Sequence, residues 1–134
     1  MLAQLTKEGC HVLGEFGYES DNRIRQYGLI HEFWRDKVKR YYKKLGYEVT
    51  AERKLNGERT DLAAAKGEER IAIEIETGNS NAIGNIKKCL DAGFSTVISV
   101  PVNRQIEGQI KEKLRKETLD QDRRVVVISS GKFE

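Results

Sequence analysis

Apolar residues recur at every third or fourth position over residues 29–45, and this spacing predicts an amphipathic helix. Gly46 follows at a position where glycine commonly ends a helix. The basic side chains of this segment lie off the apolar stripe, where they form either a solvated face or a face that contacts phosphates. The apolar stripe consists of Ile30, Phe33, Trp34, Val38, Tyr41, Tyr42 and Leu45.

Three extended segments are predicted next, at residues 47–55, 59–65 and 70–77. Asn-Gly at 56–57 is typical of a two-residue hairpin turn, and Lys-Gly-Glu-Glu at 66–69 supplies a second turn. Because tight turns join consecutive strands in opposite directions, these segments predict an antiparallel meander.

Helices and strands alternate in the remainder of the chain. We expect a helix from residue 80 or 81 to 91, a strand at 95–100, a helix at 103–117 and a strand at 123–129. The Gly- and Asn-rich residues 77–85 either cap the first of these helices or contact a phosphate at its N-terminus. The order α-β-β-β-α-β-α-β predicts an α/β fold with a mixed sheet flanked by helices.

Composition limits the class of protein further. The chain has 134 residues, of which 34% are charged and 38% hydrophobic, and no apolar run approaches the ~20 residues of a membrane span. Two isolated cysteines, Cys10 and Cys89, favour a cytoplasmic protein. We expect one domain at 29–134, preceded at 1–28 either by an extension or linker or by the remnant of a preceding module. The net charge of +3 is too small to establish a nucleic-acid partner.

Two glutamates fall on one side of the strand predicted at 70–77. Ile71, Ile73 and Ile75 alternate with small or acidic residues, so the isoleucines face a core while Glu74 and Glu76 point the other way. Neighbouring carboxylates repel each other unless a cation, a proton or water relieves them. Either these glutamates form an exposed face that meets lysines, or they belong to a site.

The turn at 66–69 sets the register of the hairpin. If Ala65 pairs with Arg70, Asp61 lies opposite Glu74, and facing residues of an antiparallel pair are roughly 5 Å apart. Asp61, Glu74 and Glu76 would then converge within reach of one divalent cation, such as Mg²⁺. The two histidines, His11 and His31, show no metal-ligand spacing.

Residues 46–78, with this order of elements, resemble the core of the PD-(D/E)xK nuclease superfamily, which has the restriction-endonuclease-like fold. The resemblance covers residues 29–101. Asp61 matches the first acid of the motif and Glu74 the second, whereas Glu76 stands where the family usually has lysine. The resemblance implies a metal-dependent DNA endonuclease of the repair or junction-resolving type. Its alternative is an inactive nucleic-acid-binding or assembly module of the same fold.

The resemblance also implies roles for particular residues. Asp61, Glu74 and the carbonyl of Ile75 would bind Mg²⁺, for which Mn²⁺ can substitute, and Glu76 would orient water or help to bind a second ion. Lys88 is our candidate for the displaced lysine, with Lys87 and Lys54 as alternatives, and Glu32 for the acid of the first helix. The expected partner is duplex or branched DNA, and a homodimer stays open.

Overall fold

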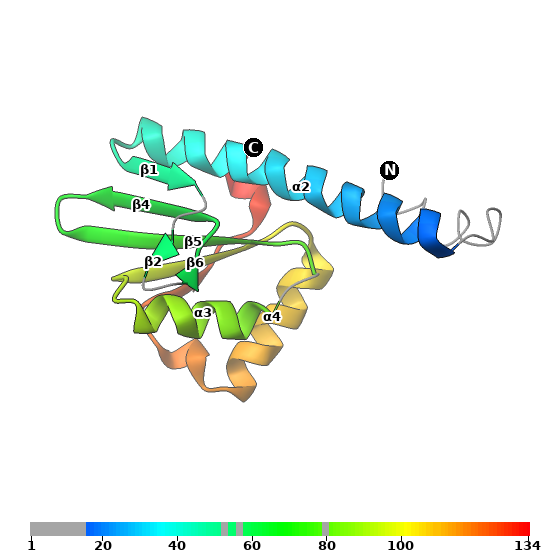
Figure 1. The fold of residues 1–134 in the computed structure, drawn as a ribbon. Coiled ribbons are helices and arrows are strands. Elements are labelled where there is room, and N and C mark those ends of the chain that lie inside the picture. Colours follow the sequence, from blue (N-terminus) through cyan, green and yellow to red (C-terminus); the bar gives the residue numbers. More distant parts are fainter. Residues whose placement is uncertain (1–15, 52–53, 56–57, 79–80) are drawn as a thin grey trace.

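The computed structural model of the protein describes residues 16–51, 54–55, 58–78 and 81–134 (Figure 1). In this part of the chain, five strands form one sheet in the order β1-β4-β5-β6-β7, and β2 and β3 form a separate hairpin. The strands are β1 (Glu48–Ala51), β2 (Lys54–Leu55), β3 (Glu58–Arg59), β4 (Leu62–Lys66), β5 (Glu69–Glu76), β6 (Thr96–Pro101) and β7 (Val125–Val127). The helices are α2 (Phe16–Lys44), α3 (Ala82–Asp91), α4 (Arg104–Lys116) and the 3₁₀ turns η2 (Leu119–Gln121) and η3 (Ser130–Phe133).

The sheet is mixed, as the sequence predicts. β4 is antiparallel to both β1 and β5, whereas β5–β6 and β6–β7 are parallel pairs. Ala65 pairs with Arg70 and Leu62 with Ile73, so the predicted hairpin register is confirmed. Gly67 has a φ of 62° in the turn between these strands, a conformation that glycine adopts without strain.

Each face of the sheet has its own apolar core. Figure 1 shows α2 along one face and α3 and α4 on the other. The β5 isoleucines pack with Val38 and Tyr42 of α2, while Ala72 packs with Ile86 of α3 and Ile110 of α4. The alternating pattern of β5 therefore separates two cores, and Glu74 and Glu76 are buried rather than exposed.

The first helix is longer than its apolar pattern predicts. It begins at Phe16 instead of residue 29, so residues 16–28 are helical rather than linker; residues 1–15 lie outside the described residues. Glycines at 17 and 28 each cost a helix about 1 kcal/mol relative to alanine, but Glu and Arg between them favour it. The predicted C-terminus is confirmed, because α2 ends at Lys44 and Gly46 has a φ of 93°.

The first two strands of the meander are each interrupted. The segment predicted at 47–55 forms β1 and β2, and the segment predicted at 59–65 forms β3 and β4. Leu55 pairs with Glu58, which agrees with the predicted hairpin, although residues 56–57 themselves are not described. The interruption before β4 leaves Thr60 and Asp61 outside any strand, and this determines the geometry of the site.

The helices after the meander begin at asparagine caps. The side chain of Asn81 accepts a hydrogen bond from the Gly84 N–H at the start of α3, and Asn103 accepts one from the Ile106 N–H in α4. The capping interpretation of residue 81 is therefore confirmed. Within the described ranges, no helix has both the length and the apolar character needed to cross a membrane.

Candidate functional site

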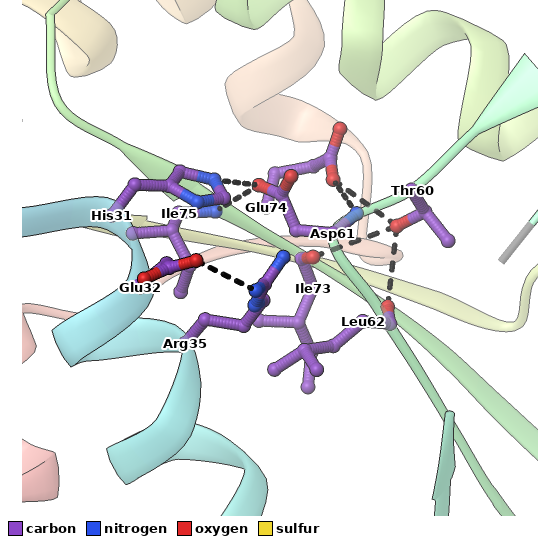
Figure 2. A network of polar contacts seen from close by, with 9 residues as sticks. All are labelled: His31, Glu32, Arg35, Thr60, Asp61, Leu62, Ile73, Glu74 and Ile75. Carbon is purple, nitrogen blue, oxygen red and sulfur yellow. Dashed lines mark hydrogen bonds and ion pairs between the residues drawn. The ribbon is translucent and has the colours of Figure 1, made fainter. Parts of the chain in front are cut away.

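Two hydrogen bonds hold Asp61 against β5 at the end of the β4–β5 hairpin, one with the side chain of Glu74 and one with the backbone of Ile75 (Figure 2). Glu74 Oε2 accepts from the Asp61 N–H at 2.8 Å, and Asp61 Oδ2 accepts from the Ile75 N–H at 2.8 Å. The backbone thus holds both carboxylates without help from a long side chain. The two acids that the sequence predicts to be neighbours are neighbours, although Asp61 precedes β4 rather than belonging to it.

Glu74 is only 3% exposed. Burial and the nearby charge of Asp61 raise the pKa of Glu74 to about 8, although hydrogen bonds from the Asp61 N–H and Thr60 oppose this shift. The Thr60 hydroxyl lies 3.1 Å from Glu74 Oε2 and can donate to it. This pKa places the protonation equilibrium of Glu74 close to neutral pH, where ordinary glutamates are fully ionised.

His31 of α2 is a site residue that sequence reasoning missed. Its Nε2 lies 3.1 Å from Asp61 Oδ2. The hydrogen bond to Asp61 raises the pKa of His31, against the opposing effect of burial. One signal was available: His31 is seven residues before the buried Val38, so both lie on the side of α2 that faces the sheet.

Glu32, the predicted acid of the first helix, does not contact the pair in the described structure. Its side chain is 67% exposed and lies 3.9 Å from the guanidinium group of Arg35. Arg35 is only 20% exposed, and Figure 2 shows it reaching from α2 toward β5. Successive residues of a helix point in different directions, and on α2 it is His31 rather than Glu32 that points toward Asp61.

Glu76 is buried at the end of β5, where it pairs in register with Pro101. Its charge is among the causes that raise the pKa of Glu74. Across the described residues, however, no group of three or more His, Cys, Asp or Glu side chains is placed to hold a metal ion. The expected convergence of three carboxylates is thus not found, because Asp61 leaves the strand and turns its carboxylate toward Ile75 and His31.

The candidate lysines occupy different places. Lys88 is on the exposed side of α3, and its role as the displaced lysine stays a prediction. Lys87 Nζ lies 2.7 Å from Oε1 of Glu117, the residue that follows α4. The side chain of Lys87 therefore points toward the end of α4. Lys54 belongs to β2, but its side chain lies outside the described residues.

Ser99 of β6 adds an unexpected polar group beside Glu74. The two residues pair in register on adjacent parallel strands, so their side chains share a face of the sheet. Ser99 is fully buried, and its Oγ has no hydrogen-bond partner among the described residues. A buried hydroxyl without a partner is unfavourable unless water or a ligand supplies one.

The donor chemistry of this site fits a hard cation. Asp61 and Glu74 each use one carboxylate oxygen for a backbone N–H, and carboxylate oxygens are ligands that Mg²⁺ prefers. Mg²⁺ usually binds one or two protein carboxylates and completes its coordination with water and phosphate oxygens. Burial and repulsion from the adjacent Asp61 raise the pKa of Glu74, so a bound cation would interact favourably with both carboxylates.

Replacement of His31 by glutamine is expected to lower the free energy of unfolding at about pH 6 by roughly 1 kcal/mol, as for a partly exposed ion pair. Because the pKa of His31 is raised in the folded protein, its stabilisation is complete below the unfolded value of 6.5. It is lost as the pH rises through the folded value, so the difference should shrink by about pH 9. Urea unfolding of both proteins at the two pH values measures this.

The matched control for His31→Gln is Arg40→Gln, which removes the Arg40–Asp36 ion pair from the same helix without involving a histidine. Its effect should be small and equal at both pH values. A His31→Gln effect that does not change with pH would contradict the contribution assigned to the His31–Asp61 contact.

Comparisons of the chain with models of protein families, with curated proteins and with solved structures gave no significant match. The function is therefore inferred from the geometry of this site and from the resemblance of its motif.

Proposed function

We propose that this protein is a Mg²⁺-dependent endonuclease with a restriction-endonuclease-like core, which hydrolyses phosphodiester bonds of DNA. The supporting observation is the buried Glu74, held next to Asp61 by backbone hydrogen bonds at the end of an antiparallel hairpin. The order of elements around this pair, a helix, a meander, a helix and a parallel strand, also agrees with the resemblance.

In this proposal Asp61, Glu74 and the carbonyl of Ile75 would hold Mg²⁺. When bound, the metal would polarise the phosphoryl group and lower the pKa of its water. The protein's own residues orient these ligands: the Asp61 N–H and Thr60 position Glu74, and the Ile75 N–H positions Asp61.

Further roles follow from the resemblance and the contacts. Glu76 would orient or deprotonate the attacking water, and Lys88 would contact the scissile phosphate. Cleavage would leave a 5′-phosphate and a 3′-hydroxyl. His31 holds its Nε2 against Asp61 Oδ2, so it offsets the charge of that carboxylate before the site is loaded.

A second candidate is an inactive nucleic-acid-binding or assembly module of the same fold. The contact that favours it is the His31–Asp61 pair, since a histidine already partly neutralises the carboxylate that a metal would need. Glutamate at position 76, in place of the usual lysine, points the same way.

Cleavage of labelled duplex, single-stranded, forked and four-way-junction DNA with Mg²⁺, Mn²⁺ or EDTA distinguishes the two candidates. We expect metal-dependent cutting by the wild-type protein. Asp61→Asn should reduce it by more than about 100-fold, since even residues that only support a metal ligand contribute 10- to 100-fold. Asp122→Asn is the matched control, because Asp122 has a similar exposure (23% against 27%) but lies in the loop before β7.

Each outcome decides between the candidates. Cutting that is abolished by EDTA and by Asp61→Asn, but not by Asp122→Asn, supports the endonuclease. Binding of the DNA panel without cutting in either metal supports the inactive module. If neither binding nor cutting occurs, the endonuclease and the nucleic-acid-binding form of the second candidate are both contradicted, and the assembly module is left.

A further inference from the structure

A groove of about 420 Å³ lies between the N-terminal half of α3 and the C-terminal end of α4. Both helices lie on the face of the sheet opposite α2 (Figure 1). The volume is within the range of about 300–1,000 Å³ of sites that hold small ligands, so a nucleotide-sized group fits.

The groove is lined by three lysines, Lys87, Lys113 and Lys116, and one acid, Glu117. Lys87 is bound to Glu117, and this ion pair lowers the pKa of Glu117. Lys113 and Lys116 are exposed, and neither forms an ion pair within the described ranges. Two ammonium groups that form no ion pair in the described part of the chain therefore line the groove.

The positive charge of this groove comes from its lysines rather than from the helix terminus. The Asn81 side chain already accepts the N–H of Gly84 at the start of α3, so that donor is satisfied. Lysine side chains from two different helices instead bring positive charge to a concave surface, and a phosphate group is the anion that such a cluster of ammonium groups binds.

One end of the groove lies within reach of the candidate site. Asn81, which lines it, is five residues after Glu76 at the end of β5, and five residues span at most about 18 Å. A DNA strand rises about 3.4 Å per nucleotide, so about five nucleotides cover that distance.

We propose that this groove binds backbone phosphates of nucleic acid a few nucleotides from the scissile bond. The proposal deepens the proposed function and relies on it for the choice of nucleic acid as the ligand. It is tested by binding in EDTA, where no cleavage occurs, so its failure is distinct from the failure of the nuclease.

The test is the salt dependence of binding to a short labelled DNA duplex, measured from about 50 to 200 mM salt. The loss variant is Lys113→Gln/Lys116→Gln. Each phosphate contact that is lost should reduce the slope of log K against log[salt] by about 0.9, and the affinity at about 0.1 M salt by roughly tenfold. Lys43→Gln/Lys44→Gln is the matched control, since both pairs are exposed lysines in the last turn of a helix.

A gain variant tests the same groove in the opposite direction. Glu117→Gln removes the acid that holds Lys87, so a third lysine becomes available for phosphate and binding should tighten several-fold. This substitution is at an exposed position after the end of α4, where loss of the fold is not a concern. Pyrophosphate and a nucleoside triphosphate are added as competitors to separate the polymer from a free phosphate ligand.

Weaker binding with a reduced slope in the α4 double variant, near wild-type binding in the α2 control and tighter binding in Glu117→Gln support the proposal. Equal loss in the two double variants would overturn it, because the groove lysines would then contribute no more to binding than lysines of α2. Absence of DNA binding by the wild-type protein would also overturn it. So would a groove-dependent affinity for the nucleoside triphosphate that exceeds the affinity for DNA.

Discussion

Glutamine in place of Glu74 is expected to abolish cleavage and, at about pH 9 without metal, to raise the free energy of unfolding by on the order of 5 kcal/mol. The folded pKa of Glu74 is about 8, against 4.5 for an ordinary glutamate. The folded protein therefore holds this proton more strongly than the unfolded chain does. The contribution of Glu74 to the free energy of unfolding is fully present below pH 4.5. It decreases by about 1.4 kcal/mol per pH unit as the pH rises to about 8.

Glutamine removes this loss because it is neutral at every pH, while its side-chain oxygen can still accept from the Asp61 N–H. Urea unfolding in EDTA at about pH 5 and about pH 9 measures the effect. Glu68→Gln is the control, since this exposed turn residue undergoes the same chemical change and should not alter the pH dependence. If the wild-type protein and Glu74→Gln lose stability equally between the two pH values, Glu74 is not the group that titrates.

Mg²⁺ extends the same experiment. A cation favours the ionised carboxylate, so saturating Mg²⁺ should reduce the loss of stability of the wild-type protein at high pH. Glu74→Gln should show a much weaker response to Mg²⁺. Identical responses of the two proteins would argue against Glu74 as a ligand.

Replacement of Ile73 by alanine is expected to lower the free energy of unfolding by about 2–5 kcal/mol. Ile73 is fully buried, lies in the core that β5 shares with α2, and pairs with Leu62 across the hairpin. Truncation leaves a cavity that the sheet and helix cannot close completely. Chemical denaturation at constant pH measures the change.

The control for Ile73→Ala is Leu29→Ala, which removes a side chain of similar size from a position on α2 that is 56% exposed. Its effect should stay within about 0.5 kcal/mol. A loss of less than about 1 kcal/mol for Ile73→Ala would contradict the packing described between β5 and α2.

The hairpin and its acid pair were predictable because local chemistry determines them. A four-residue turn fixed the pairing of Ala65 with Arg70, and the register then placed Asp61 next to Glu74. The ends of the helices were likewise visible in glycine and asparagine residues such as Gly46 and Asn81.

The contribution of α2 was not predictable from its pattern. Periodicity identifies the buried face of a helix but gives neither its height nor its angle above a sheet, so it could not decide that His31 rather than Glu32 reaches Asp61. The interruption before β4 was missed for a similar reason. Residues 59–65 favour an extended backbone throughout, and only the hydrogen bonds of Asp61 and Thr60 to the neighbouring strand favour a bend.

The two halves of the sheet also differ in how they can assemble. Asp61 and Glu74 are 13 residues apart in one hairpin, whereas β5 and β6 can pair only after the chain between them has crossed over as α3. Closing a short loop costs little entropy, and contacts between residues close in sequence form rapidly. The hydrogen bonds of the carboxylate pair therefore join residues close in sequence, so they can form early in folding, before the parallel strands pair.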